Sequence, residues 1–210
     1  MSDQPSKPLL IFPCNGNGIE ALDCLGEHYH VIGFVDDTPA KQGRHASGYP
    51  VYDRTALLRW HNAEVLAVPG GPSSFVTRGQ VITALGIDET RFARVIHPRA
   101  TVSPLATIGR NVLIMAGVVV TSNAVIGDHV CLLPNSVVHH DVRIGRLSLV
   151  GSNVTLAGGV AIGENCYIAS GTSIMHGIEI GAGALVGLGS NVIRNVAGGT
   201  TVAGNPARPI

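Results

Sequence analysis

Three ionisable residues stand together in residues 136–145, whose sequence is SVVHHDVRIG. His139, His140 and Asp141 interrupt a stretch that otherwise consists of aliphatic, small and turn-forming residues. A carboxylate beside an imidazole fixes its tautomer and raises its basicity, which is the arrangement that a general base requires. The alternative is a pair of solvated turn histidines. The residue types alone leave both interpretations open.

A repeat of six residues must position this triplet. Every sixth residue from Ile96 to Val192 is aliphatic, and a parallel series of every sixth residue from Ala100 to Val196 contains only Ala, Val, Ser, Cys, Thr or Ile. A period of six fits neither a helix nor a simple strand, and it indicates a hexapeptide β-helix in which three hexads complete one triangular coil. The register directs Val138 and Ile144 inward. It therefore places the triplet in an outward turn.

Residues 1–95 follow another pattern. Candidate strands lie at 9–12, 30–37 and 63–71, and candidate helices lie at 19–28 and 73–86. Alternating strands and helices imply a parallel sheet with right-handed crossovers. We therefore expect a Rossmann-like α/β half domain over 1–95, followed by an all-β left-handed parallel β-helix over 96–210. The first domain can cover one open end of the β-helix, and the chain's last residues the other.

A glycine-containing turn follows the first candidate strand. It contains Asn15, Gly16 and Asn17, and the acidic pair Asp36 and Asp37 ends the next strand about twenty residues later. In nucleotide-binding βαβ units the glycines admit a phosphate at a helix N-terminus, and the acid meets a ribose hydroxyl. The full G-x-G-x-x-G pattern is absent. Nucleotide binding and a plain structural turn remain equal alternatives at this point.

Composition narrows the class of protein. The 14 basic and 14 acidic residues balance, so no basic field is present to hold nucleic acid or a membrane surface. The N-terminal segment makes a poor signal peptide, and the longest later apolar run is too short to cross a bilayer. Four cysteines show no paired metal spacing. These features predict a cytoplasmic protein with reduced thiols.

Several segments carry a family resemblance. The hexads, VIHPRATVSPLATIG, SVVHHDVRIG and the terminal VAGNPARP resemble the sugar O- and N-acyltransferases of the NeuD/PglD type. The resemblance covers nearly the whole chain. It implies a homotrimer of left-handed β-helices, with acyl-coenzyme A in the groove between neighbouring subunits. It also implies that the N-terminal domain presents a nucleotide-linked amino sugar to the same cleft.

The same resemblance assigns roles residue by residue. His140 and Asp141 match the catalytic pair, and His139 is left as a flanking residue. Leu149 stands where some members have a histidine that contacts the coenzyme, so that contact is lost or differently supplied. Two further sets of positions are implied: Gly158, Ser170 and Leu188 for the coenzyme groove, and Asn15, Gly16, Asn17, Asp36, Asp37 and Gly70 for the nucleotide-sugar.

The function expected from this resemblance is acetyl-CoA-dependent N-acylation of a nucleotide-linked amino sugar. The amine would attack the thioester directly, in the synthesis of a bacterial surface glycan such as the lipopolysaccharide O-antigen. Alternatives are O-acetylation of a sugar or sialic acid, and a non-catalytic trimeric binding module. Zinc is disfavoured. His140 and His176 could stack two coils apart, but γ-class carbonic anhydrases need another histidine five residues after the second, where this chain has Gly181.

Overall fold

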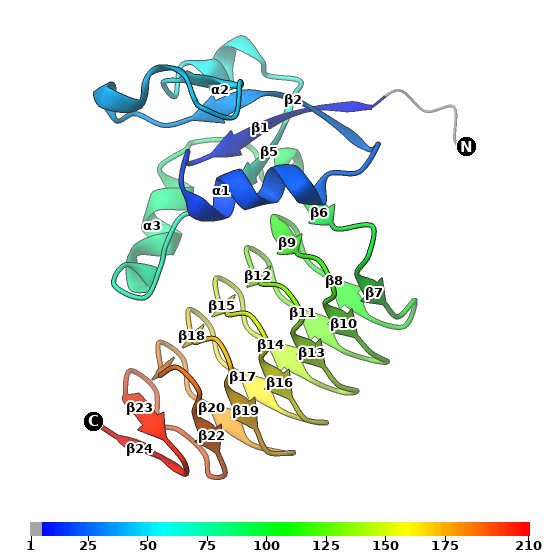
Figure 1. Ribbon diagram of the computed structural model, residues 1–210, viewed down its shortest axis with the longest axis vertical. Helices are drawn as coiled ribbons and strands as arrows, with labels where there is room; N and C mark the ends of the chain where they lie inside the picture. The colour runs from blue at the N-terminus through cyan, green and yellow to red at the C-terminus, as the bar shows by residue number, and fades with distance from the viewer. Residues whose placement is uncertain (1–5) are drawn as a thin grey trace.

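A computed structural model of the chain describes residues 6–210 and consists of an α/β domain packed against a triangular β-helix (Figure 1). The fold class predicted from the hexads is confirmed: the second part is a left-handed parallel β-helix. Residues 1–5 lie outside the described residues; they begin both the predicted first domain and the N-terminal segment that makes a poor signal peptide. Among residues 6–210 no helix is long and apolar enough to span a membrane.

The N-terminal domain contains a five-stranded, mainly parallel sheet in the order β3-β4-β2-β1-β5. The expected strands form, and two unexpected ones, β3 and β4, extend the sheet on one side. The strands are β1 (Lys7–Phe12), β2 (Tyr29–Val35), β3 (Gly43–Arg44), β4 (Pro50–Tyr52) and β5 (Glu64–Ala67), of which only β3 runs antiparallel to its neighbour.

Short helices connect these strands. The first begins three residues before the expected position, because Asn15 caps it: the Asn15 side chain accepts a hydrogen bond from the Gly18 N–H at 2.9 Å. It also ends sooner and changes into a 3-10 turn. The helices are α1 (Gly16–Glu20), η1 (Ala21–Cys24), η2 (Pro39–Lys41), α2 (Ala56–Arg59), η3 (Phe75–Thr77), α3 (Arg78–Thr83) and η4 (Glu89–Arg91).

Three sheets form the faces of the β-helix, and all their strands pair in parallel except β24, which is antiparallel to β23. Sheet 1 contains β6 (Arg94–Ile96), β9 (Val112–Ile114), β12 (Cys131–Leu132), β15 (Leu149–Val150), β18 (Tyr167–Ile168), β21 (Leu185–Val186), β23 (Thr201–Gly204) and β24 (Ala207–Pro209). Sheet 2 contains β7 (Thr101–Val102), β10 (Val119–Val120), β13 (Val137–Val138), β16 (Thr155–Leu156), β19 (Ser173–Ile174) and β22 (Asn191–Val192). Sheet 3 contains β8 (Thr107–Ile108), β11 (Val125–Ile126), β14 (Arg143–Ile144), β17 (Ala161–Ile162) and β20 (Glu179–Ile180).

The hexad explains both the interior and the turns. From Ile114 onward the inward aliphatic residues are buried in one continuous core. Every sixth residue from 111 to 189 has a left-handed backbone with positive φ. Most of these residues are Gly, Asn or Asp, the types that accept this conformation most readily. Asp141 is one of them, so the turn geometry itself accounts for an aspartate beside His140.

The N-terminal domain lies along sheet 1 rather than over an open end, which corrects the expectation from sequence. Outward residues of sheet 1, among them Leu113, Cys131 and Leu149, share a buried cluster with η1, and Ile19 of α1 packs against it. In the first coil the inward Ile96 and Val102 are only partly buried, as expected of an uncovered end. The chain's last residues extend sheet 1: β23 pairs with β21, and β24 folds back on β23.

Candidate active site at a corner of the β-helix

The His–Asp pair occupies the corner where sheet 2 passes into sheet 3, between β13 and β14. Nδ1 of His140 lies 2.7 Å from Oδ2 of Asp141, whose φ is 60°. One coil earlier, Asn123 donates from Nδ2 to Oδ1 of Asp141 at 3.1 Å. Because the carboxylate accepts from Nδ1–H, the lone pair of Nε2 is left free for a proton.

The charge on this corner follows from the same contacts. The hydrogen bonds from His140 and then from Asn123 lower the pKa of Asp141 below its ordinary value. Asp141 therefore remains ionised at neutral pH and can support an imidazolium on His140. This is the electrostatic arrangement of a general base with an orienting carboxylate.

Gly158 lies one coil beyond His140 and faces its ring. A Cβ atom on Gly158 would stand 2.6 Å from both Cε1 and Nε2 of His140. The imidazole thus lies against the backbone of Gly158, and a side chain on residue 158 would displace the ring. In a single chain the corner is open: the side chains of His140 and Asp141 are 66% and 57% exposed.

The other residues expected in the coenzyme groove lie elsewhere on the chain. Ser170 and Leu188 stack one coil apart at the corner between sheets 1 and 2, and Leu188 is 76% exposed. Ser170 Oγ accepts from the Ser152 N–H at 3.0 Å. Leu149 is buried in the cluster that joins sheet 1 to the N-terminal domain. A single chain therefore brings only Gly158 of this set to His140.

The residues expected to bind a nucleotide come together more closely. Asn15, Gly16 and Asn17 form the start of α1, and Nδ2 of Asn17 lies 3.5 Å from the Gly70 carbonyl oxygen. A Cβ on Gly16 would meet nothing within 4 Å, so open space adjoins this turn. The β1–α1 turn and the loop after β5 thus face one another at the ends of neighbouring parallel strands, which is where such sheets bind ligands.

Asp36 and Asp37 differ in their surroundings. Asp36 is buried, and its carboxylate accepts from the N–H groups of Cys14 and Thr38 and from Lys41 Nζ at 3.2, 3.0 and 2.7 Å. Burial acts to raise the pKa of Asp36, but the hydrogen bonds from Lys41 and Thr38 lower it overall. Asp36 thereby ties the glycine turn to the end of β2.

Asp37 is partly exposed and forms an ion pair with Arg54, with Nη2 and Oδ2 2.5 Å apart. Its second partner is also on Arg54, whose backbone N–H donates to Oδ1 of Asp37 at 2.9 Å.

Two residues that contribute hydrogen bonds to these sites were not identified from the sequence. Asn123 precedes Asp141 by eighteen residues, which is one coil, and that spacing is the signal that could have identified it. Lys41 donates to the Cys14 carbonyl at 2.8 Å as well as to Asp36, so it places a cation beside the glycine turn. Nothing in its local sequence distinguishes Lys41 from a surface lysine.

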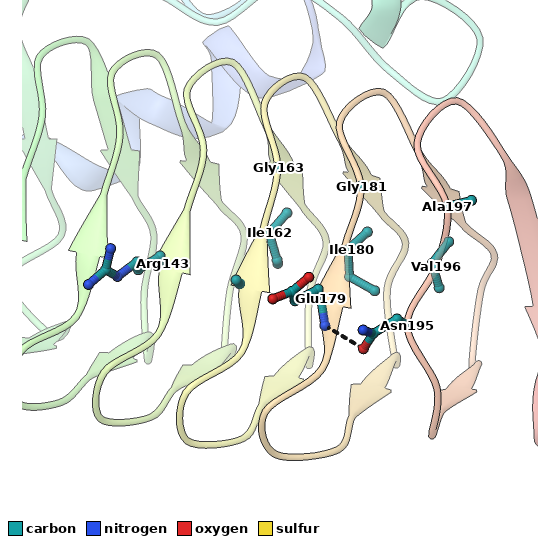
Figure 2. A pocket seen from close by; sticks show the side chains of 10 residues that line it. Arg143, Ile162, Gly163, Glu179, Ile180, Gly181, Asn195, Val196 and Ala197 are labelled. Carbon is teal, nitrogen blue, oxygen red and sulfur yellow. Dashed lines mark hydrogen bonds between the residues drawn. The ribbon is translucent and has the colours of Figure 1, made fainter.

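A shallow hollow of about 620 Å³ lies over sheet 3 and residues 195–197 (Figure 2). Arg143 and Glu179 border it, and the Glu179 N–H donates to Oδ1 of Asn195 at 3.0 Å. Neither His140 nor Asp141 lines this hollow. The candidate site is the His–Asp corner, where the reactive groups converge. Within residues 6–210 no group of three or more His, Cys, Asp or Glu is placed to hold a metal ion.

The comparisons with known proteins agree with the fold. A family model described as bacterial transferase hexapeptide (six repeats) matches residues 105–140 and 123–158. No curated protein sequence matches the chain.

Solved structures match over the full length. PerB from Caulobacter crescentus in complex with CoA and GDP-perosamine is 31% identical, with a TM-score of 0.81, and all of each chain is covered. A histidine-to-asparagine mutant of perosamine N-acetyltransferase from the same organism, also with CoA and GDP-perosamine, is 30% identical with a TM-score of 0.83; 100% of this chain and 99% of that chain are covered.

The acetyltransferase domain of PglB from Neisseria gonorrhoeae is 29% identical, with a TM-score of 0.84, over 98% of this chain and 100% of that chain. Sequence identity of this level over the whole length, together with the shared hexapeptide fold, shows the family. The chain therefore belongs to the hexapeptide-repeat sugar N-acyltransferases of the NeuD/PglD type.

Proposed function

We propose that this protein transfers the acetyl group of acetyl-CoA to the amino group of a nucleotide-linked amino sugar, with His140 as the general base. The observation that carries the proposal is the His140–Asp141 contact, which leaves Nε2 free above Gly158. The ligands named for two relatives, CoA with GDP-perosamine and acetyl coenzyme A, support the choice of substrates.

The reaction is a direct displacement. The uncharged sugar amine attacks the thioester carbonyl carbon, a C–N bond forms, and His140 Nε2 takes a proton from the nitrogen. The tetrahedral intermediate then collapses, the C–S bond breaks, and the imidazolium returns the proton to the leaving thiolate. The products are the amide and free CoA. Asp141 stabilises the imidazolium in between, and no acyl-enzyme forms.

We further propose that the active unit is a homotrimer. His140 lies at the corner between sheets 2 and 3, whereas Ser170 and Leu188 lie at the corner between sheets 1 and 2. Sheet 1 is covered by the chain's own N-terminal domain, which leaves sheets 2 and 3 available to other copies. A groove between two copies can join the two corners and cover the exposed His140. In this arrangement Gly158, Ser170 and Leu188 line the coenzyme site, and Leu149 supports it from beneath the N-terminal domain.

In the nucleotide-sugar site we assign Asn15, Gly16, Asn17 and Gly70 to direct contacts, with Asp36 and Asp37 shaping the site's rim. We propose that the N-terminal domain comprises residues 1–95 and the β-helix domain residues 96–210. The pairing of β6 (Arg94–Ile96) with β9 supports a division close to this position. The cellular setting that we propose is the cytoplasmic stage of bacterial surface glycan synthesis, such as that of the lipopolysaccharide O-antigen.

The test is transfer in vitro. The full chain is incubated with acetyl-CoA and with GDP-, UDP- or dTDP-linked 4-amino sugars, while thiol release and product mass are followed. We expect thiol release that depends on one of these sugars, and a product that resists mild base because it is an amide. A base-labile ester would support O-acetylation instead. Absence of CoA binding by calorimetry would support a non-catalytic module.

A further inference from the structure

Arg78, at the start of α3, is almost completely buried, with 1% of its surface exposed. None of the ion pairs found among residues 6–210 includes it. Its guanidinium instead donates to backbone carbonyl oxygens: Nε to Pro69 at 2.6 Å, and Nη1 to His129 at 2.8 Å and to Leu147 at 2.6 Å. A buried cation without a carboxylate partner lowers the free energy of unfolding. Because the arginine is buried despite this cost, we ask which backbone segments its hydrogen bonds hold in place.

The three carbonyl groups belong to two different parts of the molecule. Pro69 lies in the loop after β5 of the N-terminal domain, whereas His129 and Leu147 lie one coil apart at the corner between sheets 3 and 1. Leu147 has a φ of 65°, a left-handed backbone that a leucine rarely adopts. The hydrogen bond from Arg78 to its carbonyl oxygen helps to hold it there. Arg78 therefore links the β-helix to the loop.

The link continues into the turn that faces the loop. Gly70 has a φ of 105°, and a Cβ atom there would stand 2.6 Å from Cγ of Arg78, so the loop backbone packs directly on the arginine stem. The Gly70 carbonyl in turn lies 3.5 Å from Nδ2 of Asn17. A continuous chain of contacts thus runs from the β-helix through Arg78 and Gly70 to the start of α1.

A separate contact holds the domain to the same corner. The buried Asn111 side chain donates to the Ala67 carbonyl and accepts from the Ala67 N–H, each at 2.7 Å. Asn165 also donates to the Val76 carbonyl at 3.3 Å. Because these contacts do not involve Arg78, the domain remains docked when Arg78 is replaced. In such a variant the loop at 69–71 loses the hydrogen bonds through which Arg78 connects it to the β-helix.

We infer that Arg78 is a positioning residue that fixes the loop at 69–71 relative to the β-helix that carries His140. The inference rests on the proposed function, because that loop forms one wall of the nucleotide-sugar site. In this account Arg78 sets the affinity for the sugar nucleotide and contributes nothing to the coenzyme site, which lies on other corners.

The test compares Arg78→Met and Arg78→Lys with the control Arg91→Met. Arg91 also donates to three backbone carbonyls, those of Ala63, Leu57 and Trp60, but all lie within the N-terminal domain. We expect Arg78→Met to raise KM about tenfold for the sugar nucleotide that the wild type acetylates, with the Kd for CoA unchanged. Arg78→Lys, which can still reach one carbonyl, should recover part of this loss. Arg91→Met should lower Tm without the selective change in KM.

Hydrogen exchange separates this inference from the proposed function. In the full chain without ligands, the N–H groups of Gly71 and Ser74 donate to Ser74 Oγ and to the Gly71 carbonyl oxygen. Arg78→Met should speed exchange of these two amides about tenfold, and Arg91→Met should not. If the wild type transfers no acetyl group, the proposed function fails, and the exchange comparison still decides the role of Arg78. Wild-type exchange in the folded Arg78→Met protein overturns the inference, as does an equal effect of Arg91→Met. If Arg78→Met does not fold, the same comparison is made with Arg78→Lys.

Discussion

His140 Nδ1 and Asp141 Oδ2 lie 2.7 Å apart, so two residues that are adjacent in the chain direct their side chains toward each other. The left-handed backbone of Asp141 belongs to the regular series of turns that closes every hexad. The orienting carboxylate of the proposed base is therefore held by the same turn geometry that builds the scaffold.

Asp141→Asn should reduce kcat about 100-fold, because an amide cannot stabilise the imidazolium charge. Asparagine accepts the left-handed backbone well, so Tm should stay close to that of the wild type. Steady-state kinetics and thermal unfolding of the same preparation check both expectations. Asn123→Ala, which removes only the second hydrogen bond to Asp141, should have a smaller effect on kcat. An Asp141→Asn protein with wild-type kcat would remove the carboxylate from the mechanism.

Gly158→Ala should lower kcat at least about tenfold, because the new methyl group displaces the His140 ring from its position. The ring is exposed and can move aside, so the cost in stability should be small. Thermal unfolding and kcat measured together distinguish displacement of the base from general damage. Unchanged kcat would show that the ring position over Gly158 does not matter.

Lys41→Met should destabilise the protein by about 1–3 kcal/mol, because the buried Asp36 carboxylate loses its charged partner. The glycine turn that Asp36 holds should loosen, which raises KM for the sugar nucleotide and leaves the Kd for CoA as it was. Asp36 is ionised in the folded state, and its lowered pKa contributes stability that is lost as the pH falls. Lys7→Met, which removes an ion pair to Glu64 far from the turn, serves as the control. An equal rise in KM with Lys7→Met would contradict this account.

His129 should make the docking of the two domains sensitive to acid. Burial lowers the pKa of His129 from its ordinary value of 6.5 to about 4, and its Nδ1 accepts from Asn111 Nδ2 at 3.0 Å. The unfolded chain binds the proton more readily, so this contribution to the free energy of unfolding decreases as the pH falls from 6.5 towards 4. Urea unfolding across this range should show a smaller pH dependence for His129→Gln. His61→Gln, at an exposed position, should retain the wild-type dependence, and an unchanged profile for His129→Gln would contradict the assignment.

The β-helix was predictable because inward positions such as Ile126 and Ile144 can only be filled by aliphatic residues, and the register never slips. The prediction that the N-terminal domain covers an open end of the β-helix was wrong, because the domain docks on sheet 1. Leu113, Leu149 and Tyr167 occupy outward positions, where the hexad permits any residue. Their signal is a second period: on sheet 1 alone the outward residues, which recur every eighteen positions, are apolar in every coil from Val95 to Leu185. That period explains the burial of Leu149, which the family resemblance alone places at the coenzyme.

The candidate site was likewise predictable from the sequence only in part. The order of residues fixes the register and therefore the outward direction of His140 and Asp141. Asn123, Gly158 and Arg78 act through neighbours one coil or one domain away, so their roles depend on stacking distances that local sequence does not express. The buried position of Asp36 depends on Lys41, which reaches it from the short helix η2.

The most direct test of the central claim is the turnover of His140→Asn with acetyl-CoA and the sugar nucleotide that the wild type accepts. Removing a general base should reduce kcat about 100- to 10,000-fold, while the Kd for CoA and the Tm stay close to wild-type values. His139→Asn, one residue away and also exposed, should retain most of the activity. Full turnover by His140→Asn would contradict the assignment of His140 as the base.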